Sequence, residues 1–272
     1  KPMAPYLISV PAGEKSKTRE TKEKIEDMLL EKKYGRDTVI IALGGGVVGD
    51  LAGFIASTYN RGIPLIQVPT TLLAMVDSSI GGKTGVDTKY GKNLIGTIYQ
   101  PDAVFADLNF LDSLPEEEFL NGLVEIIKIA ITSDKNLFSF IEKNSKQILA
   151  KEKEVLLHII KRSIELKKNV VEKDAEESGL RQILNFGHTF GHAFESHSNY
   201  KTKHGYCVSL GIVVETKIAV LTGDLKKEEE KRIISLLKAF NLPAKINEAI
   251  DVNKIIEIML VDKKAINQKP RF

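Results

Sequence analysis

The sequence has very little cysteine, since Cys207 is the only one among 272 residues. No disulfide can form within the chain, and a zinc site built from several cysteines is excluded. Tryptophan is absent and aromatic residues make up only 7%. A single thiol is typical of proteins in a reducing compartment, so we expect a cytoplasmic location.

The sequence also lacks an excess of charge of one sign. The formal net charge is +3, and basic and acidic residues are interspersed rather than collected into a tract, which argues against a nucleic-acid partner. No apolar run approaches the roughly eighteen residues that a membrane helix needs, and no signal-peptide pattern opens the chain. We therefore expect neither nucleic acid nor a membrane as a partner.

The first part of the chain alternates strand and helix signals. Residues 6–10, 38–43, 63–68 and 103–107 read as strands, and 18–33 and 47–59 as helices. The strand at 38–43 is an unbroken apolar run of the kind that is buried on both faces of a parallel sheet. Strand, glycine turn, helix and strand between residues 38 and 68 predict a βαβ unit.

The second part of the chain carries helical periods almost throughout. The expected helices are 116–132, 134–149, 152–172, 180–197, 204–223, 227–240 and 251–261. The pattern changes from alternating strands and helices to helices alone near residues 108–114. This change predicts an α/β domain over 1–110 and a helical domain over 111–272. Clefts between two such domains commonly hold ligands.

Three glycine clusters, at residues 44–50, 77–83 and 91–93, lie within about fifty residues of one another. Such a density suggests a backbone that must approach a ligand closely, and phosphate is the usual candidate. The polar residues within these clusters are Asp50, Asp77, Lys83, Lys92 and Asn93. The clusters match neither the dinucleotide fingerprint nor a P-loop, because Gly82-Lys83-Thr84 lacks the first P-loop glycine.

Four of the five histidines fall within residues 188–204. His188 and His192, four positions apart, share a helix face, a spacing that suits a divalent metal but also a hydrogen-bonded helix interface. Glu125 interrupts an apolar helical stretch, where an unpaired charge would be costly. It is the best local candidate for a carboxylate ligand, unless it reaches water at the edge of that face, and Lys128 lies on the same face.

Taken together, the motifs resemble the 3-dehydroquinate synthase family. The matching stretches are residues 44–50, 69–84, 91–96, 125–128, 185–192 and 262–264. Their order and spacing carry the resemblance, which extends from about residue 13 to the end. It implies a dehydroquinate synthase-like fold, in which a Rossmann-like α/β domain that binds NAD precedes an all-α domain that binds metal and substrate.

The resemblance also implies a lyase of the shikimate pathway, which makes aromatic amino acids. Such an enzyme converts 3-deoxy-D-arabino-heptulosonate 7-phosphate into 3-dehydroquinate and phosphate. NAD oxidises a hydroxyl transiently, phosphate is eliminated, the ketone is reduced, and an intramolecular aldol step closes the ring. The implied metal is zinc, and cobalt suits the same ligands.

Carried over by matched position, the resemblance assigns a role to individual residues. The implied metal ligands are Glu125, His188 and His204, which moves His192 from a ligand to a residue that faces the substrate. The implied catalytic residues are His192, Lys128, Asp77 and Lys83. The implied substrate-binding residues are Arg61, Lys83, Asn93, Lys167, Arg181, Asn185 and Lys264. The implied cofactor-binding residues are Glu14, Lys17, Gly45, Gly46, Asp50, Thr70, Thr71 and Lys92.

Two departures from the family pattern leave alternatives open. The first strands of the family's NAD-binding domain precede residue 1, and Tyr206-Cys207 replaces the Glu-Ala that usually follows the third histidine and its glycine. The alternatives are another NAD- and metal-dependent sugar-phosphate cyclase, a metal-dependent alcohol or glycerol dehydrogenase, and a truncated relative without catalysis. The implied role of Arg61 in a neighbouring subunit favours a homodimer.

Overall fold

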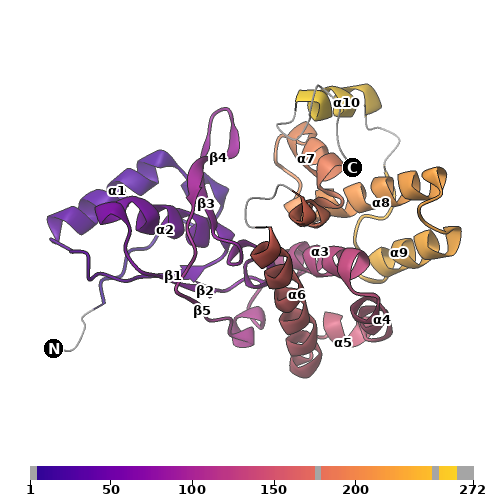
Figure 1. The fold of residues 1–272 in the computed structure, drawn as a ribbon, viewed down its shortest axis with the longest axis horizontal. Coiled ribbons are helices and arrows are strands. Elements are labelled where there is room, and N and C mark those ends of the chain that lie inside the picture. Colours follow the sequence, from indigo (N-terminus) through magenta and orange to yellow (C-terminus); the bar gives the residue numbers. More distant parts are fainter. Residues whose placement is uncertain (1–4, 175–178, 247–250, 262–272) are drawn as a thin grey trace. The chain divides into compact units, whose positions relative to one another are not determined.

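The computed structural model describes residues 5–174, 179–246 and 251–261. Contacts divide the chain into two compact units, Lys1–Phe110 and Leu111–Phe272 (Figure 1). The first unit combines strands and helices, whereas the described residues of the second unit form helices and no strands. The predicted fold class, an α/β part followed by an all-helical part, is confirmed.

The first unit is built on a parallel sheet with the strand order β1-β2-β5. The strands are β1 (Ile40–Gly44), β2 (Leu65–Pro69) and β5 (Ala103–Val104). Helix α2 (Gly46–Thr58) follows the glycine turn after β1 and leads to β2. The predicted βαβ unit is therefore confirmed, with β5 shorter than expected. The expected burial of β1 on both faces is wrong, because Ile41 and Leu43 are 63% and 56% exposed.

The core of the first unit lies between the sheet and α2. Leu51 and Ile55 of α2 pack in one cluster with Leu65 of β2. Helix α1 (Arg19–Glu31), whose N-terminus is capped by the Thr18 hydroxyl, adds Leu29 to this cluster. The amphipathic helix predicted at 18–33 is thus confirmed as a helix that packs on the core through one face.

The strand predicted at residues 6–10 is wrong, because this segment joins neither sheet. Leu7 is 85% exposed, while Ile8 and Val10 pack against the core of the first unit. Apolar side chains alone do not make a strand, since the backbone N–H and C=O groups also need a neighbouring strand as partner. The segment covers part of the core without extending the sheet.

A β-hairpin between residues 83 and 98 was not predicted. Strand β3 (Lys83–Thr88) pairs antiparallel with β4 (Gly91–Ile98). A Cβ atom on Gly96 would lie 1.8 Å from the Thr84 carbonyl oxygen, so this glycine lets the two strands approach. The glycine cluster at residues 91–93 was expected to approach a ligand, whereas Gly96, just outside that cluster, serves the pairing of the strands.

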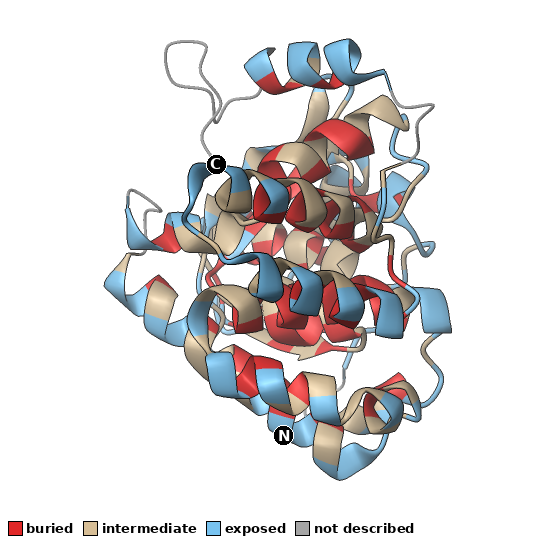
Figure 2. Cartoon of the chain, turned by 90° about the vertical axis from the view of Figure 1, so that its right-hand side faces the viewer, coloured by how far each residue is buried: buried red, intermediate tan, exposed pale blue. Residues whose placement is uncertain are grey.

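The second unit consists of eight α-helices in the described residues, together with one 3₁₀ helix. They are α3 (Glu116–Ser133), α4 (Lys135–Lys143), α5 (Ser145–Leu149), α6 (Lys153–Lys173), η5 (Leu180–Asn185), α7 (His188–His197), α8 (His204–Thr222), α9 (Lys227–Ala239) and α10 (Val252–Val261). Their buried residues, red in Figure 2, alternate with pale-blue exposed faces. Every residue of α3 from Phe119 to Ala130 is buried, which makes α3 the central helix of this unit.

Two predicted helices are each broken into two. The helix expected at 134–149 is α4 and α5, separated at Asn144, whose side-chain amide donates to the Phe140 carbonyl. The helix expected at 180–197 is η5 followed by α7, because Gly187 adopts a left-handed conformation with φ of 77°. Both breaks depend on local hydrogen bonding and dihedral angles that the apolar period does not reveal.

Four short helical turns complete the described structure. They are η1 (Glu14–Ser16), η2 (Tyr59–Arg61), the π-helical η3 (Ala74–Ser78) and η4 (Leu108–Leu111).

Helix α8 corrects one expectation from the sequence. By length and composition it is apolar enough to cross a membrane, the one such helix in the described residues, although no long apolar run was expected. Within the second unit α8 packs against α3, α7 and α9 and buries Cys207, Val208 and Ile212. Its apolar composition fits a helix that is in contact with three others.

Candidate metal centre

Glu125 and Lys128 lie one turn apart in the middle of α3. Glu125 is 0% exposed and Lys128 is 2% exposed, so Glu125 does not reach water at the edge of the apolar face. The Lys128 ammonium donates a hydrogen bond to Glu125 Oε2. A spacing of three residues places both side chains on the same helix face, and each charge is thereby compensated by the other.

Helices α7 and α8 approach each other closely through glycines. A Cβ atom on Gly211 of α8 would lie 1.8 Å from the Gly187 carbonyl oxygen, and one on Gly191 of α7 would lie 3.1 Å from Val208 Cα. The Gly187 N–H donates to Glu215 Oε2 at 2.7 Å, which fixes the start of α7 against α8. Larger residues at these glycines would push the two helices apart.

The N-terminus of α8 is held against α3 by a second close contact. The Gly205 N–H donates to Asn121 Oδ1 at 2.6 Å, and a Cβ atom on Gly205 would lie 2.2 Å from the Asn121 carbonyl oxygen. The Lys203 ammonium donates to Glu118 Oε1. These contacts place His204, the first residue of α8, over the buried face of α3.

Glu125, His188 and His204 converge as a result of this packing. Glu125 Oε1 lies 3.6 Å from His188 Nε2 and 3.7 Å from His204 Nε2. Each residue offers one ligand atom, and these atoms all lie within 4.8 Å of one another. Glu125 Oε1 is buried and has no hydrogen-bond partner among the described residues. Two imidazole nitrogens and one carboxylate oxygen are a donor set that suits a divalent metal.

The Nδ1 atoms of His188 and His204, which do not face Glu125, each contact an oxygen atom. His188 Nδ1 lies 3.2 Å from the Phe186 carbonyl oxygen, and His204 Nδ1 lies 3.2 Å from Glu195 Oε2. Both partners accept hydrogen bonds, which favours a hydrogen on Nδ1 of each ring. The Nε2 atoms are therefore the nitrogens directed at Glu125.

The electrostatics of the group follow from burial and from the charges nearby. Burial alone would raise the pKa of the Glu125 carboxyl, but Lys128, His188 and His204 hold it well below its usual range. Burial lowers the pKa of His188 well below its usual range, and Lys128 lowers it further. Burial would also lower the pKa of His204, but Glu125 and Glu195 outweigh this effect and raise it to about 9.

His192 and His197 are not part of the group of ligand atoms found in the described residues. The His192 ring lies 5.3 Å from that of His188 and 5.9 Å from that of His204, measured between ring centroids. The i, i+4 spacing alone would have made His192 a ligand.

Sequence reasoning missed Glu195 and Asn121, which contact His204 and Gly205. The signal for Glu195 was present, since an acidic residue seven positions after His188 lies near the same face of a helix. Asn121 lies 84 positions from its partner, and no local pattern connects the two.

In the first unit, the structure brings together four of the predicted cofactor-binding residues. Gly45 is the N-cap residue of α2, and a Cβ atom on it would lie 3.1 Å from Thr71 Cγ2. The Thr70 N–H donates to the Gly44 carbonyl at 2.9 Å, so the turns after β1 and β2 are adjacent, and Gly46 follows at the start of α2. The carboxyl ends of parallel strands and the N-terminus of the following helix form a typical nucleotide-binding position.

Three further predicted residues of the first unit, Glu14, Asp50 and Asn93, form a polar cluster around Lys17. Lys17 is 3% exposed, and its ammonium lies 2.5 Å from both Asp50 Oδ2 and Asn93 Oδ1. Glu14 Oε1 lies 3.8 Å from the same ammonium. Burial raises the pKa of the Asp50 carboxyl, although Lys17 acts in the opposite direction. Residues assigned to NAD and to substrate are thus in direct contact here.

The other predicted site residues take several positions within their own units. Arg61 and Lys83 are exposed, while Asp77 in η3 and Lys92 in β4 are half-buried. In the second unit Lys167 and Arg181 are buried and Asn185 is half-buried at the end of η5. Lys264 and the rest of the 262–264 motif lie outside the described residues.

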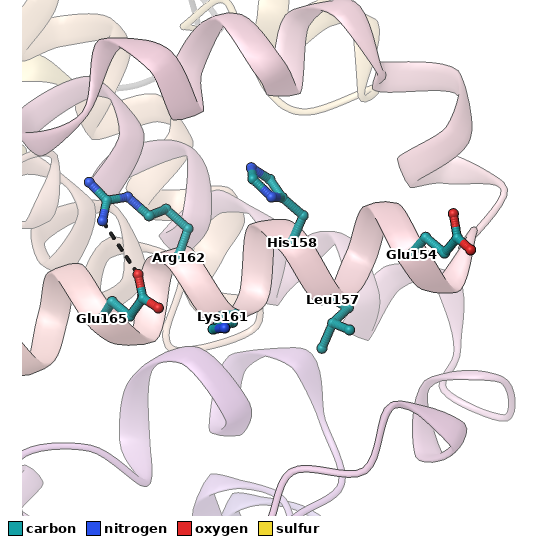
Figure 3. A pocket seen from close by; sticks show the side chains of 6 residues that line it. All are labelled: Glu154, Leu157, His158, Lys161, Arg162 and Glu165. Atoms are coloured by element: carbon teal, nitrogen blue, oxygen red, sulfur yellow. Dashed lines mark hydrogen bonds and ion pairs between the residues drawn. The ribbon is translucent and has the colours of Figure 1, made fainter.

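A surface hollow on α6 contains none of the predicted site residues (Figure 3). It is lined by Glu154, Leu157, His158, Lys161, Arg162 and Glu165. The His158 ring packs on Phe140 with 4.2 Å between centroids, and Arg162 pairs with Glu165, as Figure 3 shows, and with Asp134. His158, Arg162 and Glu165 thus have structural partners, and the group of ligand atoms found in the described residues, Glu125, His188 and His204, does not line this hollow.

Solved structures with the same architecture include two synthases. One is ValA, a 2-epi-5-epi-valiolone synthase from Streptomyces hygroscopicus with NAD+ and Zn2+ bound, with a TM-score of 0.87 and 28% identity over 94% of this chain and 71% of that one. Another is a 2-deoxy-scyllo-inosose synthase complexed with carbaglucose-6-phosphate, NAD+ and Co2+, with a TM-score of 0.83 and 30% identity over 93% and 69%. The fold is therefore the dehydroquinate synthase-like architecture.

Sequence comparisons identify the family. The models of the 3-dehydroquinate synthase N-terminal and C-terminal regions match residues 7–121 and 122–265. A 3-dehydroquinate synthase from Thermodesulfovibrio yellowstonii is 48% identical over 269 residues, which cover 98% of this chain and 75% of the relative. The chain belongs to the 3-dehydroquinate synthase family.

Proposed function

We propose that this protein is a 3-dehydroquinate synthase, a phosphate-eliminating lyase that closes a carbocycle. Its substrate is 3-deoxy-D-arabino-heptulosonate 7-phosphate, and its products are 3-dehydroquinate and phosphate. The observation that carries the proposal is the convergence of Glu125, His188 and His204 in a chain that matches the family along nearly its whole length.

Glu125, His188 and His204 would hold the divalent metal. The fit rests on Glu125 Oε1, a buried oxygen without a hydrogen-bond partner among the described residues, and on the two Nε2 atoms that face it. Zinc suits two nitrogens and one oxygen, and cobalt takes the same ligands. The structural relatives were solved with Zn2+ and with Co2+.

NAD would bind in the first unit, at the turns after β1 and β2. The N-terminus of α2 presents backbone N–H groups that suit a pyrophosphate. Gly45 and Gly46 let this end of α2 lie close to Thr71 and Ser78, since a Cβ atom on either glycine would lie 3.1 Å from one of these side chains. The remaining contacts are assigned to Glu14, Lys17, Asp50, Thr70, Thr71 and Lys92. When bound, the metal supplies Lewis acidity at a substrate hydroxyl, and NAD supplies a transient hydride acceptor.

The chain's own charged residues would bind and orient the substrate. Lys128 holds Glu125 Oε2 and so keeps Oε1 turned toward the histidines. With Asp77 it is assigned to the hydroxyls at the reacting carbons. The phosphate is assigned to Arg61, Lys83, Asn93, Asn185 and His192, and the carboxylate to Lys167, Arg181 and Lys264. Cationic and amide groups of this kind are the usual partners of such anions.

The proposed setting is that of a biosynthetic enzyme in the cytoplasm, acting on a small phosphorylated sugar acid. We propose a homodimer in which Arg61 reaches the active site of the partner subunit. Arg61 is exposed, which supports a contact with a second chain. No nucleic-acid or membrane partner is proposed.

The direct test measures phosphate release and dehydroquinate formation from heptulosonate phosphate with NAD and zinc. Release that depends on both cofactors is expected. No turnover by the folded, metal-loaded protein would contradict the proposal and favour a relative without catalysis.

A second measurement tests the ligand assignment. His188→Ala is expected to lose bound zinc, because it removes one of three ligands, whereas His192→Ala keeps the metal and loses turnover. The zinc content of the purified variants, determined by elemental analysis, decides the point. Equal loss of zinc in both variants would show that the assignment of His192 is wrong.

Another sugar-phosphate cyclase is the second candidate, because the structural relatives are cyclases of other products. The buried cations Lys167 and Arg181 favour a substrate with a carboxylate. Phosphate release from glucose 6-phosphate, in the absence of release from heptulosonate phosphate, would favour the second candidate.

A further inference from the structure

The His204 ring is held between two carboxylates through its two nitrogens. Nδ1 lies 3.2 Å from Glu195 Oε2 of α7, and Nε2 lies 3.7 Å from Glu125 Oε1 of α3. Glu125 belongs to the proposed ligand set, but Glu195 has no role in it. The role of Glu195 therefore has to be inferred from its contact with His204.

An ionised carboxylate accepts hydrogen bonds and donates none. A hydrogen bond between Glu195 and His204 therefore requires the hydrogen to be on Nδ1. In a neutral imidazole this leaves the lone pair on Nε2, the nitrogen that faces Glu125. Glu195 thus selects the form of His204 that can bind a metal through Nε2.

The position of Glu195 in the fold is unfavourable for a charged side chain. Glu195 is 6% exposed and lies in the last turns of α7. Burial disfavours a charged carboxylate, and the C-terminal end of a helix disfavours negative charge. Both costs would be avoided by an apolar residue of similar size.

His188 provides an internal comparison. Its Nδ1 lies 3.2 Å from the carbonyl oxygen of Phe186, a neutral backbone acceptor. Both imidazoles thus direct Nε2 at Glu125, but the acceptor at Nδ1 is a charged carboxylate for His204 and a neutral carbonyl for His188. A carboxylate behind an imidazole makes the ring a stronger electron donor than a carbonyl does.

We propose that Glu195 is a positioning residue that orients His204 and strengthens it as a metal ligand. The role rests on the proposed function, since it assumes that Glu125, His188 and His204 bind a divalent metal. Glu195 does not touch the metal in this arrangement and acts through the imidazole of His204.

A purely structural role makes a different prediction. Glu195 Oε2 is near the first residue of α8, where a negative charge also stabilises the helix N-terminus. If that were its whole role, replacing Glu195 would lower stability and leave the affinity for metal unchanged. Measurements of affinity and of coordination geometry therefore separate the two roles.

The experiment compares Glu195→Gln and Glu195→Ala with the wild-type chain. The dissociation constants for Zn2+ and Co2+ are measured by competition with a chelator, and the visible absorption of the Co2+ form reports its coordination. Ser209→Ala is the matched control, because it removes another partly buried hydrogen bond of α8, from the Ser209 hydroxyl to the Pro243 carbonyl, at 2.7 Å.

Glu195→Ala is expected to weaken Zn2+ binding by about 10- to 100-fold and to change the Co2+ spectrum. Glu195→Gln keeps an acceptor oxygen without the charge, so we expect a smaller loss, about 3- to 10-fold, and partial retention of the spectrum. Ser209→Ala lowers thermal stability without changing either dissociation constant.

Wild-type affinity and an unchanged Co2+ spectrum in a folded Glu195→Ala would overturn the role. If Glu195→Ala does not fold, Glu195→Gln decides, and wild-type affinity in that variant would likewise overturn it. A wild-type chain that binds neither Zn2+ nor Co2+ would instead refute the metal assignment on which the role rests.

Discussion

The two units hold their charged residues in different surroundings. In the second unit Glu125 is 0% exposed and lies within a run of α3 in which every residue is buried. In the first unit Lys17 is buried, but the Asp50 side chain is 17% exposed and Asn93 is exposed in the hairpin. One ionic group is enclosed by core packing and the other borders on solvent.

The difference separates two ways of building a site. The geometry of the proposed metal site in the second unit depends on how closely α3, α7 and α8 pack, so stability and metal binding should change together there. The Lys17 cluster joins η1, α2 and β4 at the surface of its unit. Its loss should affect the first unit without disturbing the metal site.

The largest expected effect is in the enclosed group. Glu125→Leu leaves the Lys128 ammonium buried without its carboxylate, which we expect to lower the free energy of unfolding by about 3–5 kcal/mol. The double variant Glu125→Leu/Lys128→Met replaces the pair with apolar side chains and should recover most of that loss. Urea denaturation of the metal-free proteins measures both. Equal stability of the single and double variants would contradict the view that the two charges are interdependent.

A matched pair of glycine substitutions compares the units directly. An added Cβ atom lies 1.8 Å from a backbone carbonyl oxygen in Gly211→Ala and equally in Gly96→Ala. Each variant should lose about 1–3 kcal/mol of stability from overpacking. Only Gly211→Ala separates α7 from α8, so only this variant should also bind Zn2+ more weakly in a chelator competition. Weakened binding in Gly96→Ala would show that the metal site is not independent of the hairpin.

In the first unit, Lys17→Met removes the ammonium that pairs with Asp50 and Asn93. We expect a loss of about 1–2 kcal/mol, because the partly buried carboxylate loses its partner. Lys24→Met is the control, since the Lys24 and Glu20 side chains are 69% and 73% exposed and such pairs contribute little. Thermal denaturation should show a lower midpoint for Lys17→Met alone. Zinc affinity should be unchanged in both variants.

The smallest expected effect is a pH dependence of the metal-free protein. The pKa of His204 is raised to about 9 in the folded state, so its stabilising contribution is complete below pH 6.5 and is lost as the pH rises to about 9. The pKa of His188 is lowered by burial, so its contribution decreases as the pH falls below 6.5. The slope from one group is at most about 1.4 kcal/mol per pH unit.

His204→Gln provides the control for this dependence. Urea denaturation between pH 6.5 and 9 should show a smaller decrease in stability for His204→Gln than for the wild-type chain. An identical slope in both proteins would assign the dependence to other groups.

Much of the fold could be predicted from local patterns. The apolar run of β1, the glycine turn and the helical period of α2 are each visible within a few residues, and together they specify the βαβ unit. The hairpin of β3 and β4 was missed because its residues show no alternation of apolar and polar side chains. The glycine cluster at 91–93 was attributed to a ligand, and the close approach of Gly96 to Thr84 of the opposite strand was not foreseen.

The candidate site was predicted in part for the same reason. Glu125, with its charge within an apolar helix, and the clustered histidines are conspicuous in the sequence. The contacts that hold His204 in place are not visible in the sequence, because Asn121 and Gly205 meet only after α3 and α8 have packed. Long-range contacts of this kind depend on tertiary packing, which no local spacing encodes.

The burial of Glu125 in α3 also bears on how much folded protein a cell maintains. A cation that binds only the folded arrangement adds its binding free energy to folding, about 4 kcal/mol when the free ion is a thousandfold above its dissociation constant. Metal starvation would then raise the fraction of chains that unfold and reach proteases. Through one buried carboxylate, the amount of this protein in a cell would follow the supply of its metal.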